Sequence, residues 1–163
     1  MAPHSVADFA EAFAAVCRSG AAGLRVVGAA TKLRGASIAP EAVSTRNLAA
    51  LPDYRPADLT LTAQAGAPIA ELRRVAERDN LALPIDAADF DGQATLGGVV
   101  ADNDVGPCGL ALGMPRDAVL GATVVLGDGT LVRSGGRVLK NSAGYACHRL
   151  LAGSRGQLAR WSS

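Results

Sequence analysis

The sequence predicts an α+β fold in which short helices alternate with short strands. Apolar residues recur at intervals of three and four in segments 6–18 and 69–79, a helical pattern, and alternate with polar ones over 59–63, a strand pattern. Hydrophobic residues make up 49% of the chain and charged residues 19%, the balance of a globular protein rather than a disordered one. The 163 residues suit one domain or two small lobes.

The first elements follow from these patterns. Segment 6–18 is predicted as an amphipathic helix with Ser5 as its N-cap. Residues 24–27 form a short apolar run that leads into a turn at 28–32. We expect a second short strand at 43–46, followed by a connection that contains two prolines.

The middle of the chain continues the alternation. We expect a strand at 59–63, a helix at 69–79 and a short extended piece at 81–85. Segment 94–101 carries two adjacent glycines, and 102–115 is predicted as a loop.

The last third carries a predicted hairpin. Residues 118–126 form the strongest strand candidate, and Gly127-Asp128-Gly129 is a hairpin turn of the Asp-Gly kind. The return strand is expected at 130–133, and a final helix near 144–152.

Charge and composition exclude several classes of protein. The formal net charge is +1 and there is no basic run, so nothing indicates a nucleic-acid partner. No apolar stretch reaches the roughly 18 residues of a membrane helix, and the N-terminus lacks the basic region of a secretory signal. Three separated cysteines predict small apolar residues of a cytoplasmic protein rather than disulfides or a metal site.

The turn at Gly28, Ala29, Ala30, Thr31 and Lys32 is the first candidate site. A turn just after a buried strand can direct successive backbone N–H groups at a phosphate. The spacing matches neither a nucleotide P-loop nor a dinucleotide fingerprint. The alternative is an ordinary loop at the end of a strand.

The second candidate site is segment 94–101. Gly97 and Gly98 leave a surface without side chains, on which free backbone N–H groups suit a planar ligand with a diphosphate, and Thr95 adds a hydroxyl. The alternative is a tight turn within the core. Lys140 and Asn141 follow a double glycine, where a lysine can offset phosphate charge, or where the pair is a solvated turn.

Taken in order, these segments resemble the FAD-binding (PCMH-type) domain of the p-cresol methylhydroxylase/vanillyl-alcohol oxidase superfamily, and most of all the FAD-binding subunits of bacterial glycolate oxidase. The resemblance spans residues 26–157. The segments that carry it are Val27-Gly28-Ala29-Ala30-Thr31-Lys32, Pro56-Ala57-Asp58-Leu59-Thr60, Ala65-Gly66-Ala67-Pro68, Leu83-Pro84, Ala94 to Ala101, Arg116 to Gly121, Gly135 to Asn141 and Leu150 to Ser154.

The resemblance implies a two-lobed FAD-binding domain without a C-terminal cap domain. The first lobe would be residues 1–56, with the diphosphate loop at 28–32, and the second lobe 57–163. FAD would bind non-covalently, because the loop has no histidine to tether it. The implied cofactor-binding residues are Gly28, Ala29, Ala30, Thr31, Lys32, Gly66, Pro84, Thr95, Leu96, Gly97, Gly98, Ala101, Lys140, Asn141 and Gly144.

It also implies a flavin-dependent oxidoreductase subunit for a 2-hydroxy acid such as glycolate. Its partners would be a second flavin subunit and an iron–sulfur subunit, which could hold a cytoplasmic protein at the inner membrane. No residue stands out as a catalytic base and no metal ligands are evident, so we do not expect the chain to be active alone. The alternative is a non-catalytic scaffold that keeps the fold and binds partner subunits without FAD.

The sequence departs from the family pattern in two places. Ala29 and Ala30 stand where the loop usually has glycines, and either would cost about 1 kcal/mol if it needed a positive φ. The tail 158–163 does not match the family, whose chains continue with further strands and a cap domain. We therefore expect a truncated second lobe with an open sheet edge.

Overall fold

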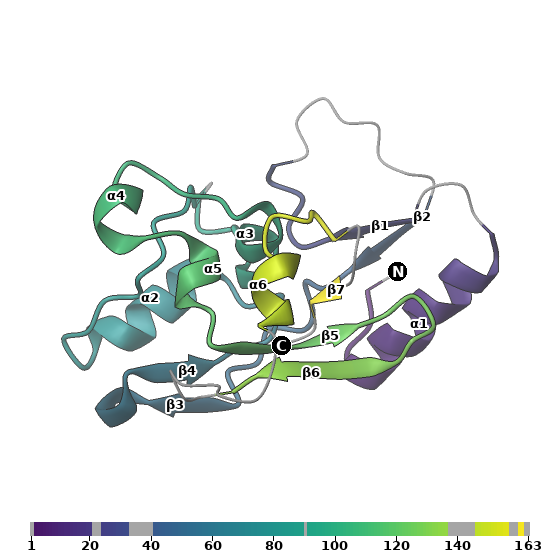
Figure 1. Ribbon diagram of the computed structural model, residues 1–163, viewed down its shortest axis with the longest axis horizontal. Coiled ribbons are helices and arrows are strands. Elements are labelled where there is room, and N and C mark those ends of the chain that lie inside the picture. Colours follow the sequence, from purple (N-terminus) through teal and green to yellow (C-terminus); the bar gives the residue numbers. More distant parts are fainter. Residues whose placement is uncertain are drawn as a thin grey trace.

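The computed structural model describes residues 2–20, 24–32, 41–89, 91–136, 146–156 and 160–161. Within these residues, short helices alternate with strands of three small sheets, which confirms the α+β class (Figure 1). The helices are α1 (Val6–Arg18), α2 (Ile69–Glu77), α3 (Leu96–Asp102), α4 (Gly109–Leu112), α5 (Pro115–Ala118) and α6 (Cys147–Leu151), with a 3-10 turn η1 (Pro56–Asp58). The strands are β1 (Leu24–Val27), β2 (Glu41–Ser44), β3 (Asp53–Arg55), β4 (Thr60–Thr62), β5 (Gly121–Val125), β6 (Leu131–Gly135) and β7 (Arg160–Trp161).

Helix α1 forms as its sequence predicts. The Ser5 hydroxyl accepts a hydrogen bond from the Asp8 amide at 3.0 Å and so caps the first turn. Phe9 and Phe13 are buried and stack with ring centroids 6.2 Å apart. They pack with Val43 of β2 and Val125 of β5 in one apolar cluster, which attaches α1 to two sheets.

The strands around the first turn differ slightly from expectation. Strand β1 matches the prediction and pairs in parallel with β2, which lies at 41–44 rather than 43–46. Residues 53–55, predicted as part of a connection, form β3 and pair antiparallel with β4. Strand β3 has three residues, too few to show an alternating pattern, so its pairing with β4 rather than periodicity defines it. The lobe boundary expected at residue 56 stays a prediction.

Segment 94–101, for which a tight turn in the core was the alternative interpretation, contains most of helix α3. Two glycines cost a helix interior about 1 kcal/mol each, which is why the sequence does not suggest one. Packing outweighs that cost, because Val99 and Val100 are buried in two apolar clusters. The predicted loop 102–115 contains α4 and the start of α5. These helices were not predicted because four residues are too few to show a helical pattern.

The third sheet has the order β6-β5-β7. The predicted hairpin joins β5 and β6, and the Asp128 carboxylate accepts the Thr130 amide at 2.8 Å in its turn. Strand β7 pairs with Val124 and Val125 on the other side of β5, so part of the edge that we expected to be open is covered. The final predicted helix is confirmed as α6, although it is shorter than expected.

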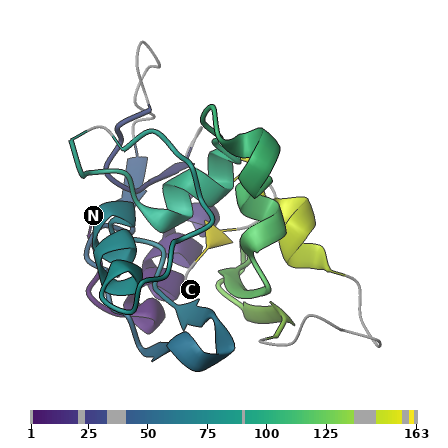
Figure 2. The ribbon, with the colours of Figure 1, turned by 90° about the vertical axis from the view of Figure 1, so that its left-hand side faces the viewer.

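The helices of the second half lie side by side. Figure 2 shows α2 and α6 on opposite sides of the molecule, with α3, α4 and α5 between them.

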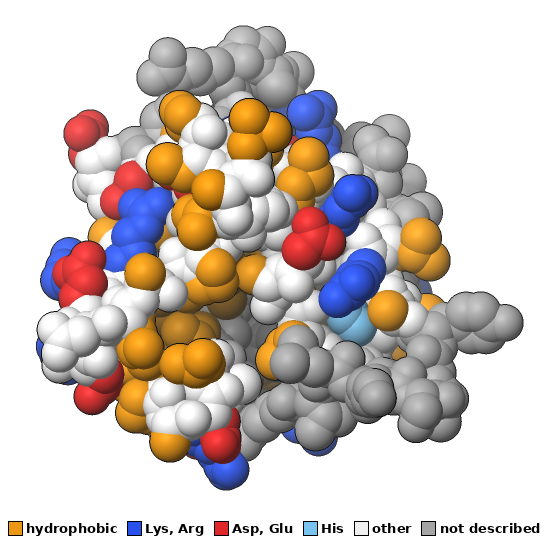
Figure 3. Space-filling model, turned by 60° about the vertical axis from the view of Figure 1, so that its left-hand side comes forward, with side chains coloured by type: hydrophobic (Ala, Val, Ile, Leu, Met, Phe, Trp, Pro, Cys, Tyr) orange, Lys and Arg blue, Asp and Glu red, His pale blue; other side chains and the backbone are white. Residues whose placement is uncertain are grey.

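Hydrophobic side chains are spread over the face seen in Figure 3. The exposed hydrophobic residues include Leu110, Leu112 and Met114, on α4 and just after it. None of the described helices is long and apolar enough to cross a membrane.

Candidate functional site

A pocket of about 520 Å³ opens between β1, the turn after it and both ends of α3. Its volume lies in the range of small-molecule sites. A recess of about 50 Å³ adjoins it and reaches toward Thr45, Ala65 and Gly97. The larger pocket is lined by Leu24, Arg25, Val26, Val27, Gly28, Ala29, Ala30, Thr31, Lys32, Ala94, Thr95, Gly98, Val99, Ala101, Asp102 and Arg155.

The turn after β1 presents its backbone to this pocket. In the described part of the chain, the amides of Gly28, Ala29, Ala30 and Thr31 donate to no protein acceptor. Ala30 has φ 57°, a left-handed conformation that non-glycine residues seldom adopt. A left-handed residue within a turn can direct successive N–H groups toward one point, which creates an anion site from backbone alone.

Lys32, at the end of this turn, is already paired. Its Nζ lies 2.7 Å from Oδ2 of Asp104, and both side chains are largely covered, with 19% and 27% of their surface exposed. The same carboxylate oxygen accepts the Ala88 amide at 3.2 Å. Lys32 therefore ties the turn to the segment that follows α3.

The free N–H groups expected at the start of α3 are not there, which corrects the sequence-based interpretation. The Leu96 amide donates to Ala67 at 2.9 Å, and the Gly97 amide donates to Ala65 at 2.7 Å. The Gly98 amide donates to the Thr95 hydroxyl at 3.3 Å as part of the helix cap. Any anion site built from backbone amides must therefore lie on the turn after β1 rather than on α3.

Two glycines of this region, Gly28 and Gly97, permit close approach of neighbouring segments. A Cβ on Gly97 would lie 2.7 Å from the Ala65 Cβ and 2.9 Å from its carbonyl oxygen. A Cβ on Gly28 would collide with the Thr95 hydroxyl. The sequence correctly marks both positions as sites of close approach, but the neighbours are the chain's own atoms.

The other predicted site residues separate into three groups. Ala29, Ala30, Thr31, Lys32, Thr95, Gly98 and Ala101 line the pocket, and Gly97 lines the recess. Leu96 packs in the core, Gly66 lies against the carbonyls of Thr45 and Leu48, and Pro84 is exposed away from the pocket. Lys140, Asn141 and Gly144 lie outside the described residues.

Three charged residues of the pocket were missed by the sequence analysis: Arg25, Asp102 and Arg155. Arg155 Nε lies 3.0 Å from Asp102 Oδ1, and its side chain is 77% exposed. Its segment reaches the pocket because the Gly153 amide donates to Val100 at 3.0 Å and the Arg155 amide to Ala101 at 2.8 Å. The Gly-Ser-Arg-Gly pattern marks a turn, but nothing in it indicates contact with α3.

Other reactive side chains lie away from this pocket. His148 is buried on α6, and its Nδ1 lies 3.1 Å from the Ser134 hydroxyl. Burial lowers the pKa of His148 below its ordinary 6.5, and the nearby Arg149 lowers this pKa further. Cys17, Cys108 and Cys147 are free and exposed. No group of three or more His, Cys, Asp or Glu side chains among the described residues could hold a metal ion.

Comparison with known proteins identifies relatives of this chain. Over 106 residues it is 39% identical to "Glycolate oxidase subunit GlcE" of Escherichia coli (strain K12), covering 65% of this chain and 30% of that protein. It is 39% identical over 101 residues to "Glycolate oxidase subunit GlcD" of Bacillus subtilis (strain 168), covering 62% of this chain and 21% of that protein. A "D-2-hydroxyglutarate dehydrogenase" of Xanthomonas citri pv. viticola is 37% identical over 106 residues, covering 65% and 22%.

The fold has a match among solved structures. An "alkyldihydroxyacetonephosphate synthase" superposes with a TM-score of 0.77 at 19% identity, over 99% of this chain and 30% of that one. The chain thus spans less than a third of the length of these relatives. The FAD binding domain family matches residues 1–149. This chain therefore belongs to the FAD binding domain family, with FAD as its cofactor, as the resemblance to p-cresol methylhydroxylase-type domains implied.

Proposed function

We propose that the turn 28–32 binds the diphosphate of FAD. The observation that carries this proposal is the set of amides at Gly28, Ala29, Ala30 and Thr31, which face the pocket without an acceptor in the described part of the chain. A diphosphate is rich in acceptor oxygens, and hydrogen bonds to an ionised acceptor are about twice as strong as neutral ones. The turn thus fits the anionic part of FAD.

The remainder of FAD would extend along α3. Gly98 and Ala101 line both the pocket and the recess and leave room beside the helix, and Thr95 and Gly97 complete this wall. When bound, the flavin supplies the redox chemistry by accepting a hydride or electrons from a substrate. The chain's own residues would hold the cofactor and fix its orientation.

The reaction is proposed from the relatives. Glycolate oxidase and D-2-hydroxyglutarate dehydrogenase, which appear among the relatives' names, are enzymes of 2-hydroxy acids. We therefore propose that the complete protein is a flavin-dependent oxidoreductase of a 2-hydroxy acid, glycolate being the first candidate. Two relatives are named as subunits, which supports partners, and we propose a second flavin subunit and an iron–sulfur subunit. Such a complex would be cytoplasmic or peripheral to the inner membrane.

Retention of FAD tests the proposal. The purified chain is mixed with FAD, excess cofactor is removed, and the absorbance of the flavin bands is recorded. We expect retained flavin in the wild type and its loss in Ala101→Leu, because a larger side chain on this face of α3 fills the pocket. Ala111→Leu on α4, which is exposed, is the matched control and should retain FAD. A folded wild type that retains no flavin would contradict the proposal.

The scaffold alternative draws on one observation. Ala30 holds a left-handed conformation without glycine, and this strain could weaken the diphosphate loop. A colourless chain that still binds its partner subunits would favour the scaffold. A yellow chain would exclude it.

A further inference from the structure

Three cationic side chains line the pocket, those of Arg25, Lys32 and Arg155, and two of them are paired with carboxylates of one short segment. Lys32, on the turn after β1, pairs with Asp104, and Arg155, on the segment after α6, pairs with Asp102. Both carboxylates lie at the C-terminal end of α3 or just beyond it. The two ion pairs decide which of these paired cations an anionic ligand can engage.

The two ion pairs differ in how easily they can open. The Lys32 pair is mostly covered, and its carboxylate also accepts the Ala88 amide, so opening it would leave a half-buried charge and an unsatisfied N–H. The Arg155 side chain is 77% exposed, whereas Asp102, like Asp104, is 27% exposed, and within the described residues the Asp102 carboxylate accepts no further hydrogen bond as that of Asp104 does. Because the cation of this pair is exposed and that of the Lys32 pair is not, an incoming anion can replace Asp102 as a partner of Arg155 more readily than it can replace Asp104.

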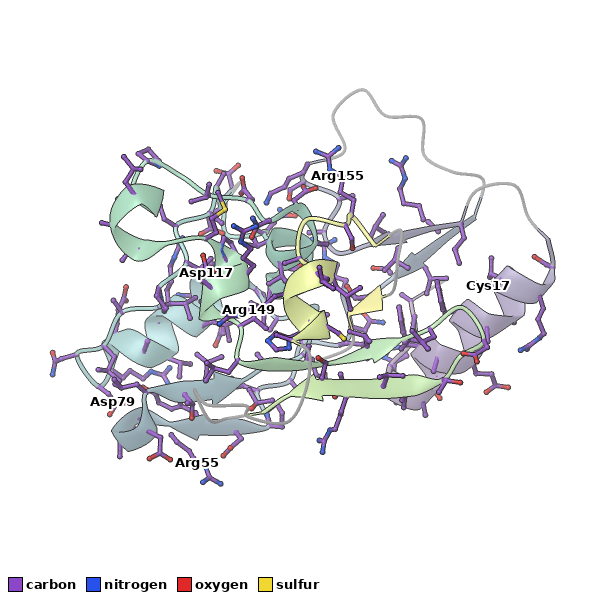
Figure 4. The ribbon with its side chains drawn as sticks, viewed as in Figure 1. Cys17, Arg55, Asp79, Asp117, Arg149 and Arg155 are labelled. Atoms are coloured by element: carbon purple, nitrogen blue, oxygen red, sulfur yellow. The ribbon has the colours of Figure 1, made fainter. Side chains whose placement is uncertain are left out.

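The backbone of Arg155 is fixed while its side chain is exposed. Arg155 has φ 51°, and hydrogen bonds from the Gly153 and Arg155 amides to Val100 and Ala101 anchor the segment on α3. Figure 4 shows Arg155 on the segment after α6, well separated from Arg149 on that helix. Arg155 lines both the pocket and the recess, so a ligand that fills them would lie beside this residue.

We infer that Arg155 is a specificity-determining residue that contacts the diphosphate, and that Asp102 holds it in place until the ligand binds. Lys32 stays paired with Asp104 and keeps the turn in position. The inference rests on the proposed FAD site and extends it to an arginine that comes from a distant part of the chain. A guanidinium forms two parallel hydrogen bonds with phosphate oxygens, which the backbone amides of the turn cannot do.

The test compares ligands with and without a diphosphate. Dissociation constants for FAD, ADP and riboflavin are measured by calorimetry or flavin fluorescence for the wild type, Arg155→Gln, Asp102→Asn and Arg149→Gln. Loss of Arg155 should weaken FAD and ADP about tenfold and leave riboflavin unchanged, because a charge-assisted hydrogen bond is lost. Asp102→Asn should bind FAD and ADP at least as tightly as the wild type. Arg149→Gln, with the same charge change away from the pocket, should match the wild type.

The outcomes separate this inference from the proposed function. A wild type that binds FAD, with no change in Arg155→Gln or an equal loss of all three ligands, would overturn the role of Arg155 and leave the FAD site intact. Weaker FAD binding by Asp102→Asn would also overturn the inference, since the pair would then act as one structural unit. ADP binding that depends on Arg155, without FAD binding, would support the inference and contradict the proposed function. Binding of none of the ligands would overturn both.

Discussion

Gly28 lies directly against the side chain of Thr95. A Cβ on Gly28 would collide with the Thr95 hydroxyl and would be 3.2 Å from the Thr95 Cβ and 3.3 Å from its Cγ2. We expect Gly28→Ala to reduce the free energy of unfolding by about 1 to 3 kcal/mol, since overpacking forces neighbouring atoms apart. Urea denaturation checks this value.

A double-mutant cycle shows whether this contact is the cause. Thr95→Ala removes Oγ1 and Cγ2, the hydroxyl oxygen being the atom that would collide most severely, and leaves the Cβ. By deleting the α3 cap, it should cost about 1 kcal/mol by itself. In that background, Gly28→Ala should cost much less than in the wild type. Equal costs in both backgrounds would show that the alanine acts elsewhere.

Ala30 should respond to substitution differently from its neighbour. Ala30→Gly removes the strain of a left-handed residue but adds freedom to the unfolded chain, so we expect stability to change by roughly 0 to 1 kcal/mol in the favourable direction. Ala29 is not among the described residues with positive φ, so Ala29→Gly should destabilise by about 0.5 to 1 kcal/mol. Denaturant titrations of both variants without ligand measure the change in the free energy of unfolding. A change of the same sign in both variants would contradict the prediction.

The Lys32–Asp104 pair should contribute more to stability than an exposed pair. Lys32→Gln leaves a half-buried carboxylate without its cation and should cost about 1 to 2 kcal/mol. Arg74→Gln breaks the exposed pair with Glu71 on α2 and should cost less than about 0.5 kcal/mol. Chemical denaturation of the two variants at the same pH makes the comparison, and similar costs would mean that burial does not strengthen the Lys32 pair.

His148 should make stability depend on pH. Its pKa is lowered in the folded state, so below pH 6.5 the unfolded chain binds more protons at this residue than the folded chain does. The contribution is therefore fully present above pH 6.5 and is lost as the pH falls toward the lowered pKa. Unfolding midpoints between pH 7.5 and pH 5 should fall less steeply for His148→Gln, whereas His4→Gln should keep the wild-type slope. Parallel curves for all three proteins would exclude His148 as the cause.

The sequence predicts elements whose stability is local. Helix α1 is recovered with its cap because Ser5, Phe9 and Phe13 carry a helical pattern without help from other segments. Helix α3 is not recovered, because Gly97 and Gly98 argue against a helix and only the surrounding core stabilises it. Strand β7 exists through its pairing with β5, which no local pattern reveals.

The candidate site follows the same division. The turn Gly28 to Lys32 is visible in the sequence because a buried strand ends in a glycine-containing segment. The contribution of Arg155 is not visible, because 122 residues lie between it and Lys32 and hydrogen bonds to α3 bring its segment to the pocket. Long-range contacts of this kind leave no periodic trace.

The segment Asp102 to Asp104 forms ion pairs with two walls of the pocket. Asp104 pairs with Lys32 on the turn after β1, and Asp102 pairs with Arg155 on the segment after α6. The turn after β1 and the segment after α6 thus share an anchor. In hydrogen exchange, a disturbance of the Asp102 to Asp104 segment would therefore raise the opening rates of both walls together, so the site would gain or lose its shape as one cooperative unit.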